Sequence, residues 1–398
     1  MRTLLFFTEY YYPAQNSTSF YISKIINACA KKWADNLRIF CATPNRDEEP
    51  LVRSNIRIVR FGNSGLNKNH LLGRLLKFLI LTLKFSIAAL FCVKKYDTVF
   101  AVTNPAFMLI FLAALRKIRP FRFVLLVYDI FPEVLIPGGL SKKESIKYRL
   151  ALSVFNWAYD SADSIIVIGR DMQEVVEKKT KDPSKIVFIP NWSDTGHITS
   201  VEKKDNPILK RLGIEKDFIF SIAGNMGRTQ GLDNLLNALS LWDQNNHSAF
   251  LFMGGGAKEV FLRNEKEKRG LSKVYVTGWI PDEEQNAMLS ACDVAVISLA
   301  EGMYGLSVPS KSYFNMAAGK PLLLIADEHS EIARVIAENK IGWVVPPNNP
   351  KALANTLNDI QKLSQEELQR LGENARKTAE SLYSEEKVLP QYVNTICA

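Results

Sequence analysis

The sequence predicts an α/β protein built from two doubly wound domains. Short apolar runs separated by helical patterns occur in two series along the 398 residues, and a polar stretch from Pro190 to Lys216 lies between them. Strands that alternate with helices form parallel sheets covered by helices on both faces. A chain of this length has room for two cores. Because ligands of such sheets bind beyond the carboxyl ends of the strands, we expect the site in the cleft between the domains.

Each apolar run predicts one strand, and the two series together set the domain boundaries. The predicted strands are 3–8, 37–42, 56–61, 98–102, 123–128, 164–168 and 185–189 in the first series, and 218–223, 249–254, 273–277, 294–298, 321–325 and 343–345 in the second. We therefore place a first domain at 1–200 and a second at 201–383. The second ends with a long amphipathic helix of about 365–383, and 384–398 is a candidate for crossing back to the first domain.

The turn after the first strand of the second domain is the most informative pattern. The strand Phe218–Ala223 is followed by Gly224, Gly227 and Gly231 and then by leucines spaced as in a helix. The first N–H groups of a helix lack partners and its dipole favours an anion, so the turn is a candidate phosphate site. Arg228 within the turn adds a guanidinium suited to a diphosphate.

A second candidate cation lies further along the same domain. The loop after strand 294–298 enters a helix near Ser310, a residue type that suits an N-cap. Lys311 would then lie at a helix start, where the dipole disfavours a cation unless an anion is bound. Lys311 is thus a candidate site residue, and a solvated surface lysine is the alternative.

The charge distribution indicates an anionic partner for the first domain. The net charge is +9, and residues 51–150 hold 17 Lys and Arg against 4 Asp and Glu. We find no nucleic-acid recognition motif, so a membrane surface fits better than a nucleic acid. The five scattered cysteines lack metal-ligand spacing, and the N-terminus lacks the features of a signal peptide, so we expect a reduced cytoplasmic setting without a bound metal or cofactor.

A basic, apolar helix of about 68–95 is the expected membrane contact. Arg74, Lys77 and Lys84 interrupt the apolar run, which shortens it below the roughly 18 residues that a spanning helix needs. On a helix these charges fall within about 80° of one another. We expect the helix to lie in the headgroup plane with the three charges on anionic lipid. A core helix with snorkelling lysines is the alternative.

Further motifs accompany the glycine-rich turn in a fixed order along the chain. In the second half they are Gly278-Trp-Ile-Pro281, Ala291-x-Asp293, Glu301-Gly302, Val308-Pro-Ser-Lys311, Ala317-Ala-Gly-Lys-Pro321, Ser330-Glu-Ile-Ala333 and Gly342-Trp343. In the first half they are Phe7-Thr-Glu-Tyr-Tyr-Tyr-Pro13, Asn16-Ser-Thr18, Asp129-Ile-Phe-Pro-Glu133 and Pro190-Asn-Trp-Ser-Asp194. Together they resemble the retaining GT-B glycosyltransferases called family 4, and within them the bacterial subgroup that includes L-fucosamine transferases of O-antigen synthesis.

The resemblance implies a GT-B fold of two facing domains with a C-terminal crossover helix, and a transfer between two substrates. A nucleotide-diphosphate sugar, with UDP favoured, would bind the second domain. A polyprenyl-diphosphate-linked saccharide would enter from the first domain, at the cytoplasmic face of the inner membrane. Arg228 and Lys311 would hold the diphosphate, Glu301 would contact the donor, and Asp129 would act on the acceptor hydroxyl or contact the sugar.

The resemblance also implies wider sets of contact residues. The expected donor contacts are Gly224, Asn225, Gly227, Gln230, Gly278, Trp279, Ile280, Tyr304, Gly305, Leu306 and Ser310. The expected residues of the acceptor side are Asn16, Ser17, Thr18, Tyr128 and Glu133.

Several positions depart from the family pattern and keep a second reading open. Asn225 and Gln230 stand where many members have Arg and Lys, Phe314 where many have a ribose-gripping glutamate, and Tyr128 where many have a histidine. None of the four histidines fills that last gap, and all are expected at the surface. A catalytically weak scaffold subunit is therefore an alternative. A sugar-nucleotide epimerase is disfavoured because its soluble substrates need no basic helix, and a dehydrogenase because no Gly-x-Gly-x-x-Gly follows the first strand.

Overall fold

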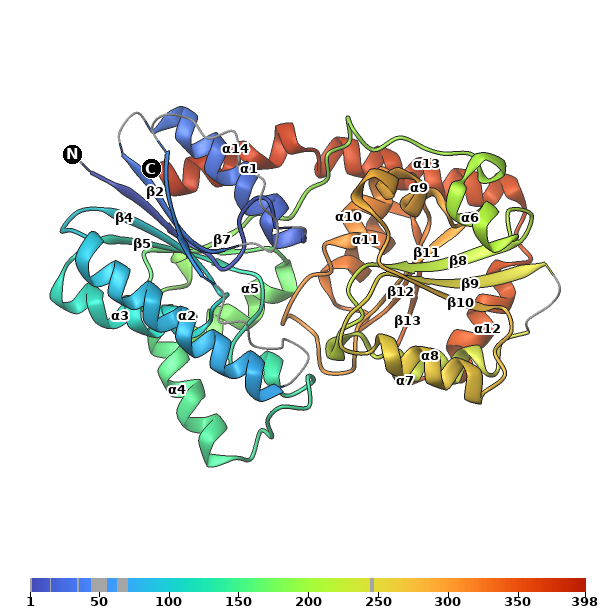
Figure 1. Cartoon of the computed structure of the whole chain (residues 1–398), viewed down its shortest axis with the longest axis horizontal. Helices are drawn as coiled ribbons and strands as arrows, with labels where there is room; N and C mark the ends of the chain where they lie inside the picture. Colours follow the sequence, from blue (N-terminus) through green and yellow to red (C-terminus); the bar gives the residue numbers. More distant parts are fainter. Residues whose placement is uncertain (1, 15, 34–35, 44–55, 63–70, 244–246) are drawn as a thin grey trace.

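The chain folds into two Rossmann-like domains that lie side by side (Figure 1). The computed structural model describes residues 2–14, 16–33, 36–43, 56–62, 71–243 and 247–398. Each domain is a parallel sheet between layers of helices, which confirms the predicted GT-B fold class.

The first sheet has strand order β3-β2-β1-β4-β5-β6-β7, and all of its pairs are parallel. Its strands are β1 (Leu4–Phe7), β2 (Leu37–Ala42), β3 (Ile56–Phe61), β4 (Thr98–Val102), β5 (Arg122–Val127), β6 (Ser164–Val167) and β7 (Ile186–Phe188). The central strands β1 and β4 are buried along their whole length, which explains their continuous apolar runs. The sequence predicted all seven strands, with small shifts of their ends.

Helices cover both faces of this sheet. They are α1 (Ser17–Lys32), α2 (Leu71–Cys92), α3 (Phe107–Ile118), α4 (Ile146–Asp160) and α5 (Arg170–Val176), with 3₁₀ turns η1 (Glu133–Leu135), η2 (Glu177–Lys179) and η3 (Pro183–Lys185). Helices α2, α3 and α4 pack in succession on one face, and α1 lies on the other (Figure 1).

The second sheet has strand order β10-β9-β8-β11-β12-β13, again with parallel pairs. Its strands are β8 (Phe218–Ala223), β9 (Ser248–Met253), β10 (Val274–Gly278), β11 (Val294–Ser298), β12 (Leu322–Ile325) and β13 (Gly342–Val345). Its helices are α7 (Leu232–Leu239), α8 (Glu259–Lys268), α9 (Gln285–Ser290), α10 (Lys311–Ala317), α11 (Glu331–Asn339), α12 (Pro350–Ile360) and α13 (Gln365–Leu382), with 3₁₀ turns η5 (Arg228–Gln230) and η6 (Asp282–Glu284).

The polar stretch between the domains is more ordered than its composition predicts. It contains the 3₁₀ turn η4 (Lys203–Asp205) and helix α6 (Pro207–Leu212). Asn206 caps α6 and its amide donates to the carbonyl of Ala287, at a distance of 2.7 Å. The stretch therefore belongs to the second domain from about this point.

The chain crosses between the domains twice, and the two crossings lie together. The backbones of Ser193 and Ser384 pair as a parallel bridge, after which α14 (Glu385–Cys397) packs along α1 of the first domain. Trp192 is completely buried at the crossing. Helix α14 is the crossover helix that the resemblance predicted.

Candidate active site

Two glycine turns form the floor of the candidate site, at the carboxyl ends of β8 and β9. The N–H of Gly224 donates to the carbonyl of Met253 at 2.6 Å, and the N–H of Met226 donates to the carbonyl of Gly255 at 2.8 Å. Gly224 has a φ of +103°. This left-handed conformation and the close approach of the two turns explain why glycine is needed there.

Lys311 reaches the underside of the first turn. A Cβ added to Gly224 would lie 2.4 Å from Cε and 2.7 Å from Nζ of Lys311. The residue as a whole is only partly buried, but Nζ itself is shielded from solvent and has no hydrogen-bond partner in the part of the chain that the structure describes. Burial lowers the pKa of this amine to about 8. An ammonium without a counterion at a glycine turn is poised to receive an anion.

Arg228 and Gln230 line the same turn from the other side. Arg228 is exposed, and no described side chain forms an ion pair with it. The carbonyl of Gln230 accepts from the hydroxyl of Ser298 at 2.7 Å, which holds η5 against β11, while its side-chain Oε1 is buried without a described partner. Helix α7 begins at Leu232, one residue after η5, and its N-cap Gly231 offers no side chain to its first N–H groups.

Trp279 covers the second glycine turn. A Cβ added to Gly255 would lie 2.4 Å from the indole Nε1, although the Trp279 side chain as a whole is 66% exposed. Asn225 lies over the neighbouring Gly256, whose added Cβ would be 2.5 Å from Oδ1 of Asn225. These residues and Gly278 form an open surface at the ends of β9 and β10, suited to a flat ring.

Glu301 opens the segment 299–310, hereafter the β11–α10 loop. Its Oε2 accepts from the side-chain amide of Asn348 at 2.5 Å, in an exposed contact within the second domain. Ser310 precedes α10 but has helical φ and ψ and its side chain forms no capping bond, so its predicted N-cap role is wrong. Other parts of the loop are engaged by the first domain: the Tyr304 hydroxyl donates to Glu174 at 2.5 Å.

The residues expected on the acceptor side begin at α1 of the first domain. Asn16 is the N-cap of α1, and its Oδ1 accepts from the N–H of Ser19 at 2.8 Å. Ser17 and Thr18 form the first turn of the helix. Phe20, one turn on, contacts Phe314 of α10 with ring centroids 5.4 Å apart. The start of α1 therefore lies against the helix that carries Lys311.

The other acceptor-side candidates have different surroundings. Tyr128 has a buried hydroxyl without a described partner, and burial raises its pKa. The backbone of Asp129 pairs with Ser307 of the β11–α10 loop. Glu133 accepts from the buried Nζ of Lys179 at 2.5 Å. That buried ion pair favours a structural role for Glu133.

Sequence comparisons agree with this geometry. Residues 205–378 match the family model described as glycosyl transferases group 1, and residues 24–197 match that of glycosyltransferase family 4. The probable glycosyltransferase WbjE of Pseudomonas aeruginosa is 38% identical over 385 residues, which cover 97% of this chain and 95% of that protein. The protein belongs to glycosyltransferase family 4.

More distant relatives of this glycosyltransferase extend the comparison. O-antigen chain mannosyltransferase C of Escherichia coli is 24% identical over 99% of the chain and 97% of its own length. Among solved structures, sucrose-phosphate synthase of Thermosynechococcus elongatus has a TM-score of 0.77 at 16% identity, covering 98% of this chain and 97% of that one. HepE of Anabaena in complex with UDP has a TM-score of 0.72 at 16% identity over the whole of both chains. At these identities the solved structures show the fold alone.

The predicted membrane residues of the glycosyltransferase are arranged differently from expectation. Lys77 is buried and its Nζ lies 3.2 Å from Oε1 of the buried Glu9, so it does not present charge to lipid. Lys84 donates to the carbonyl of Gly62 at 3.0 Å. The side chain of Arg74 lies outside the described residues.

The apolar run of α2 was also predicted to be too short. The window Leu75–Cys92 has a mean hydropathy of 2.1 and is long and apolar enough to cross a membrane by composition, with 22% of it buried in the fold. Soluble core helices pass the same test. The outward face of α2 is apolar, whereas the sequence predicted a basic one.

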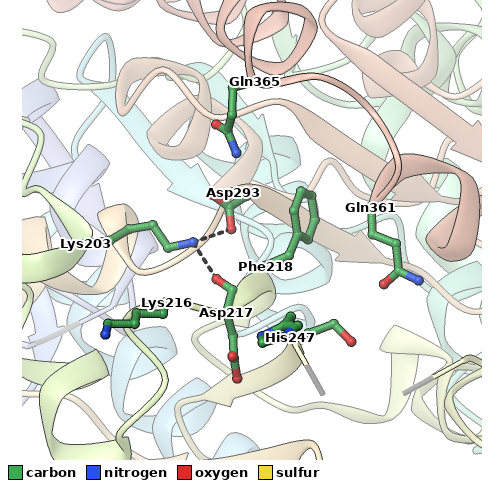
Figure 2. Close-up of a pocket in the computed structure, with 9 residues that line it drawn as sticks. Lys203, Lys216, Asp217, Phe218, His247, Asp293, Gln361 and Gln365 are labelled. Carbon is green, nitrogen blue, oxygen red and sulfur yellow. Dashed lines mark hydrogen bonds and ion pairs between the residues drawn. The ribbon is translucent and has the colours of Figure 1, made fainter. Parts of the chain in front are cut away.

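A cavity of 270 Å³ lies far from this site, at the amino ends of β8, β9 and β11. Figure 2 shows Lys203 between Asp293 and the backbone oxygen of Asp217, at 2.7 and 2.6 Å. The ammonium of Lys203 is thus neutralised by the carboxylate of Asp293. Ligands of doubly wound sheets bind at the opposite edge, so we do not place the reaction here.

The remaining titratable residues of the described ranges were compared with the requirements of a metal site. No group of three His, Cys, Asp or Glu within the described ranges could hold a metal ion. His197 and His329 are exposed, His247 borders the cavity of Figure 2, and His70 lies outside the described residues.

Sequence reasoning missed the contribution of α5. Asp171 and Glu174 contact the β11–α10 loop from the first domain. The glycines at 169 and 305, where the two domains touch, were the available sign of this contact.

Proposed function

We propose that this glycosyltransferase moves a sugar from a nucleotide-diphosphate sugar to a polyprenyl-diphosphate-linked saccharide in the synthesis of a bacterial surface polysaccharide such as an O-antigen. The observation that carries the proposal is the buried, unpaired Nζ of Lys311 beneath the Gly224 turn. A diphosphate supplies the missing counterion and meets the free N–H groups of α7 and the guanidinium of Arg228. The O-antigen relative supports the choice of pathway.

A UDP-sugar is the donor that we favour. HepE, which shares the fold, has been solved with UDP and with UDP-glucose. The uracil would stack on Trp279 above the Gly255 turn. The resemblance to L-fucosamine transferases favours an N-acetylated amino-deoxy hexose as the transferred sugar.

Charge stabilisation on the leaving diphosphate is the main chemical task in this proposal. Lys311, Arg228 and the backbone N–H groups of the turn would neutralise the charge that develops as the glycosidic bond to phosphate breaks, without a metal ion. Glu301, held by Asn348, would orient the sugar. The acceptor oxygen would bond to the anomeric carbon as the diphosphate leaves, its proton would pass to the carboxylate of Asp129, and the product would keep the anomeric configuration.

The lipid-linked acceptor places the enzyme at the cytoplasmic face of the inner membrane as a peripheral protein. A stripe of exposed apolar side chains on each of α2 and α4 supports this: Leu79, Leu83, Ile87 and Phe91 on α2, and Ile146, Leu150 and Val154 on α4. We call these two stripes the apolar face. The exposed basic residues Lys142, Lys143, Lys147 and Arg149 border it on α4 and the loop before it. Apolar insertion framed by basic residues is typical of binding to anionic membranes.

Thermal unfolding with UDP, GDP, ADP and dTDP and their sugar conjugates tests the donor site. A ligand that binds only the native state raises the melting temperature, and we expect a selective rise with UDP and its conjugates. Arg228→Ala and Lys311→Ala should abolish this rise and the transfer of sugar. No rise with any nucleotide would contradict the proposal.

The scaffold alternative has one observation in its favour. Phe314, where many family members have a glutamate, packs against Phe20 across the cleft instead of facing a ribose. A wild-type enzyme that binds membranes and nucleotide but transfers no sugar to any lipid-linked acceptor would support that alternative.

A further inference from the structure

The β11–α10 loop belongs to the second domain but is held by the first. The N–H of Ile130 donates to the carbonyl of Leu306 at 2.9 Å, which extends the pairing of Asp129 with Ser307. Both contacts join the segment after β5 to the second half of the loop, residues 306 and 307. Glu301 lies in the first half of the loop and Lys311 follows its last residue. The loop therefore connects the two donor-side groups of the proposed function.

Asp171 at the start of α5 is the centre of a second set of contacts. Its side chain is almost completely buried, and Oδ2 accepts from the N–H of Gly305 at 3.3 Å and from the N–H of Glu331 at 3.1 Å. Its Oδ1 accepts from the N–H of Met172 at 2.7 Å. One carboxylate of the first domain therefore binds the loop and the first residue of α11 at once.

Glu174, one turn further along α5, adds a third point of attachment. It accepts from the Tyr304 hydroxyl at 2.5 Å and from the guanidinium of Arg334 at 2.7 Å. Tyr304 was expected to contact the donor, but its hydroxyl is engaged by the first domain instead. The loop is thus fastened by four consecutive residues, 304–307.

Two glycines allow the domains to approach this closely. Gly305 has a φ of +65°, and a Cβ there would lie 2.6 Å from the carbonyl oxygen of Asp171. A Cβ at Gly169 would lie 2.4 Å from Oδ1 of Asp171 and 2.7 Å from Val308. Side chains at either glycine would push the loop away from α5, so the contact depends on close fit as well as on hydrogen bonds.

We propose that Asp171 is a positioning residue for donor binding, through which the first domain sets the shape of the β11–α10 loop. The inference rests on the proposed function, because it assumes that the donor binds beside this loop. Separation of the domains would release residues 304–307 and with them the path of the backbone between Glu301 and Lys311. Donor affinity and domain contact are then linked, and by reciprocity the donor stabilises the contact.

Asp171→Asn tests the proposal, because the amide keeps the size of the side chain but cannot accept both N–H groups with one charged oxygen. We expect the donor KM and the nucleotide Kd to rise by about tenfold, with the acceptor KM unchanged. Glu338→Gln is the matched control: Glu338 binds Arg170 at the same domain contact but does not touch the loop, so its donor KM should equal that of the wild type. A merely structural role would lower the melting temperature of Asp171→Asn and leave the donor KM unchanged.

A second pair of variants keeps the test decisive if Asp171→Asn does not fold. Tyr304→Phe and Glu174→Ala each remove the bond between Tyr304 and α5, and each should raise the donor KM about threefold. A folded Asp171→Asn, or failing that both of these variants, with wild-type donor KM and nucleotide Kd would overturn the inference. Wild-type protein that binds no nucleotide would instead overturn the proposed function, so the two failures are distinguishable.

Discussion

Two lysines of this enzyme illustrate how the surroundings of a charge decide its role. Lys77 has a partner in Glu9, with 10% and 3% of the two side chains exposed, and so completes the first domain. Nζ of Lys311 is equally hidden but has no described partner. The first is a structural ion pair, and the second is the open position that a diphosphate would fill.

Lys311→Met should stabilise the enzyme without ligand at pH 7. The pKa of Lys311 is lowered to about 8 in the folded protein, so the unfolded chain binds more protons between about pH 8 and the usual lysine pKa of about 10.5. Wild-type stability therefore rises with pH through that window. We expect the variant to be more stable by up to about 3 kcal/mol at pH 7, with the difference shrinking above pH 8.

Urea unfolding of both proteins from pH 6.5 to 10.5 measures this difference. Arg228→Met is the control, because that side chain is exposed and its removal should leave the pH dependence unchanged. Equal stability of wild type and Lys311→Met across the range would show that the amine is not buried unpaired.

Lys77→Met should destabilise the fold rather than weaken membrane binding. Removing one partner of a buried ion pair leaves Glu9 uncompensated, at a cost of about 3 kcal/mol. Urea unfolding and vesicle sedimentation, with the partly exposed Lys84→Met as control, give the two readouts. A variant with wild-type stability that no longer sediments with anionic vesicles would mean that Lys77 faces lipid.

The geometry of the candidate site was predictable from the sequence where it is local. The glycine turn, Arg228 and Lys311 were predicted because a strand, a turn and a helix start lie within short stretches, and the structure places Lys311 beside Gly224. The side chain of Lys77 was wrongly predicted to face lipid. Helical spacing gives its direction around the helix axis but does not reveal its partner Glu9, which is 68 residues away in the chain. Asp171 was missed for the same reason, since its hydrogen bonds to the second domain reach residues far along the chain.

At the scale of elements, the strands were more predictable than the helices. Most strands of the described residues are apolar runs, and the sequence predicted each of the thirteen strands found there from these runs and their spacing. The outward side of α2 was predicted wrongly because almost its whole circumference is apolar, and only packing against the sheet decides which stripe is covered. Helix α6 was missed within a polar stretch because a single turn capped by Asn206 has little periodicity.

The apolar face of α2 and α4 should insert into membranes. Replacing Leu83, Ile87 and Phe91 together by glutamine should reduce binding to vesicles containing anionic lipid at least tenfold, because binding strength follows the inserted apolar area. Leu241→Gln with Val260→Gln is the matched control, since both are exposed apolar residues of the second domain. Binding that falls equally in both proteins, or in neither, would argue against insertion of this face.

At the scale of the whole molecule, the two domains touch at the crossing, at the Phe20–Phe314 contact and along the β11–α10 loop. The distance between the donor-side and acceptor-side residues therefore depends on the angle between the domains. A bound diphosphate would be attracted by the cations of the second domain and would contact the loop that the first domain holds. Binding of the diphosphate and approach of the two domains therefore favour each other.

We therefore expect a nucleotide-sugar donor to make the enzyme more compact in solution. Small-angle scattering with and without UDP-sugar should show a smaller radius of gyration with donor, whereas Lys311→Ala should give the same profile in both conditions. Identical wild-type profiles under saturating donor would mean that the domains do not move on binding.

The return of α14 to α1 has a consequence for biosynthesis. The ribosome makes α1 (Ser17–Lys32) long before α14 (Glu385–Cys397), yet Tyr21 of α1 and Tyr392 of α14 both bond to the backbone around Trp192. The first domain leaves the ribosome without α14. Its Tyr21 and Trp192 rings therefore lack their cover from α14 while the second domain is translated. Such a nascent chain exposes apolar surface for longer than a domain that is complete on emergence, and its folding is then bound to the folding of its neighbour.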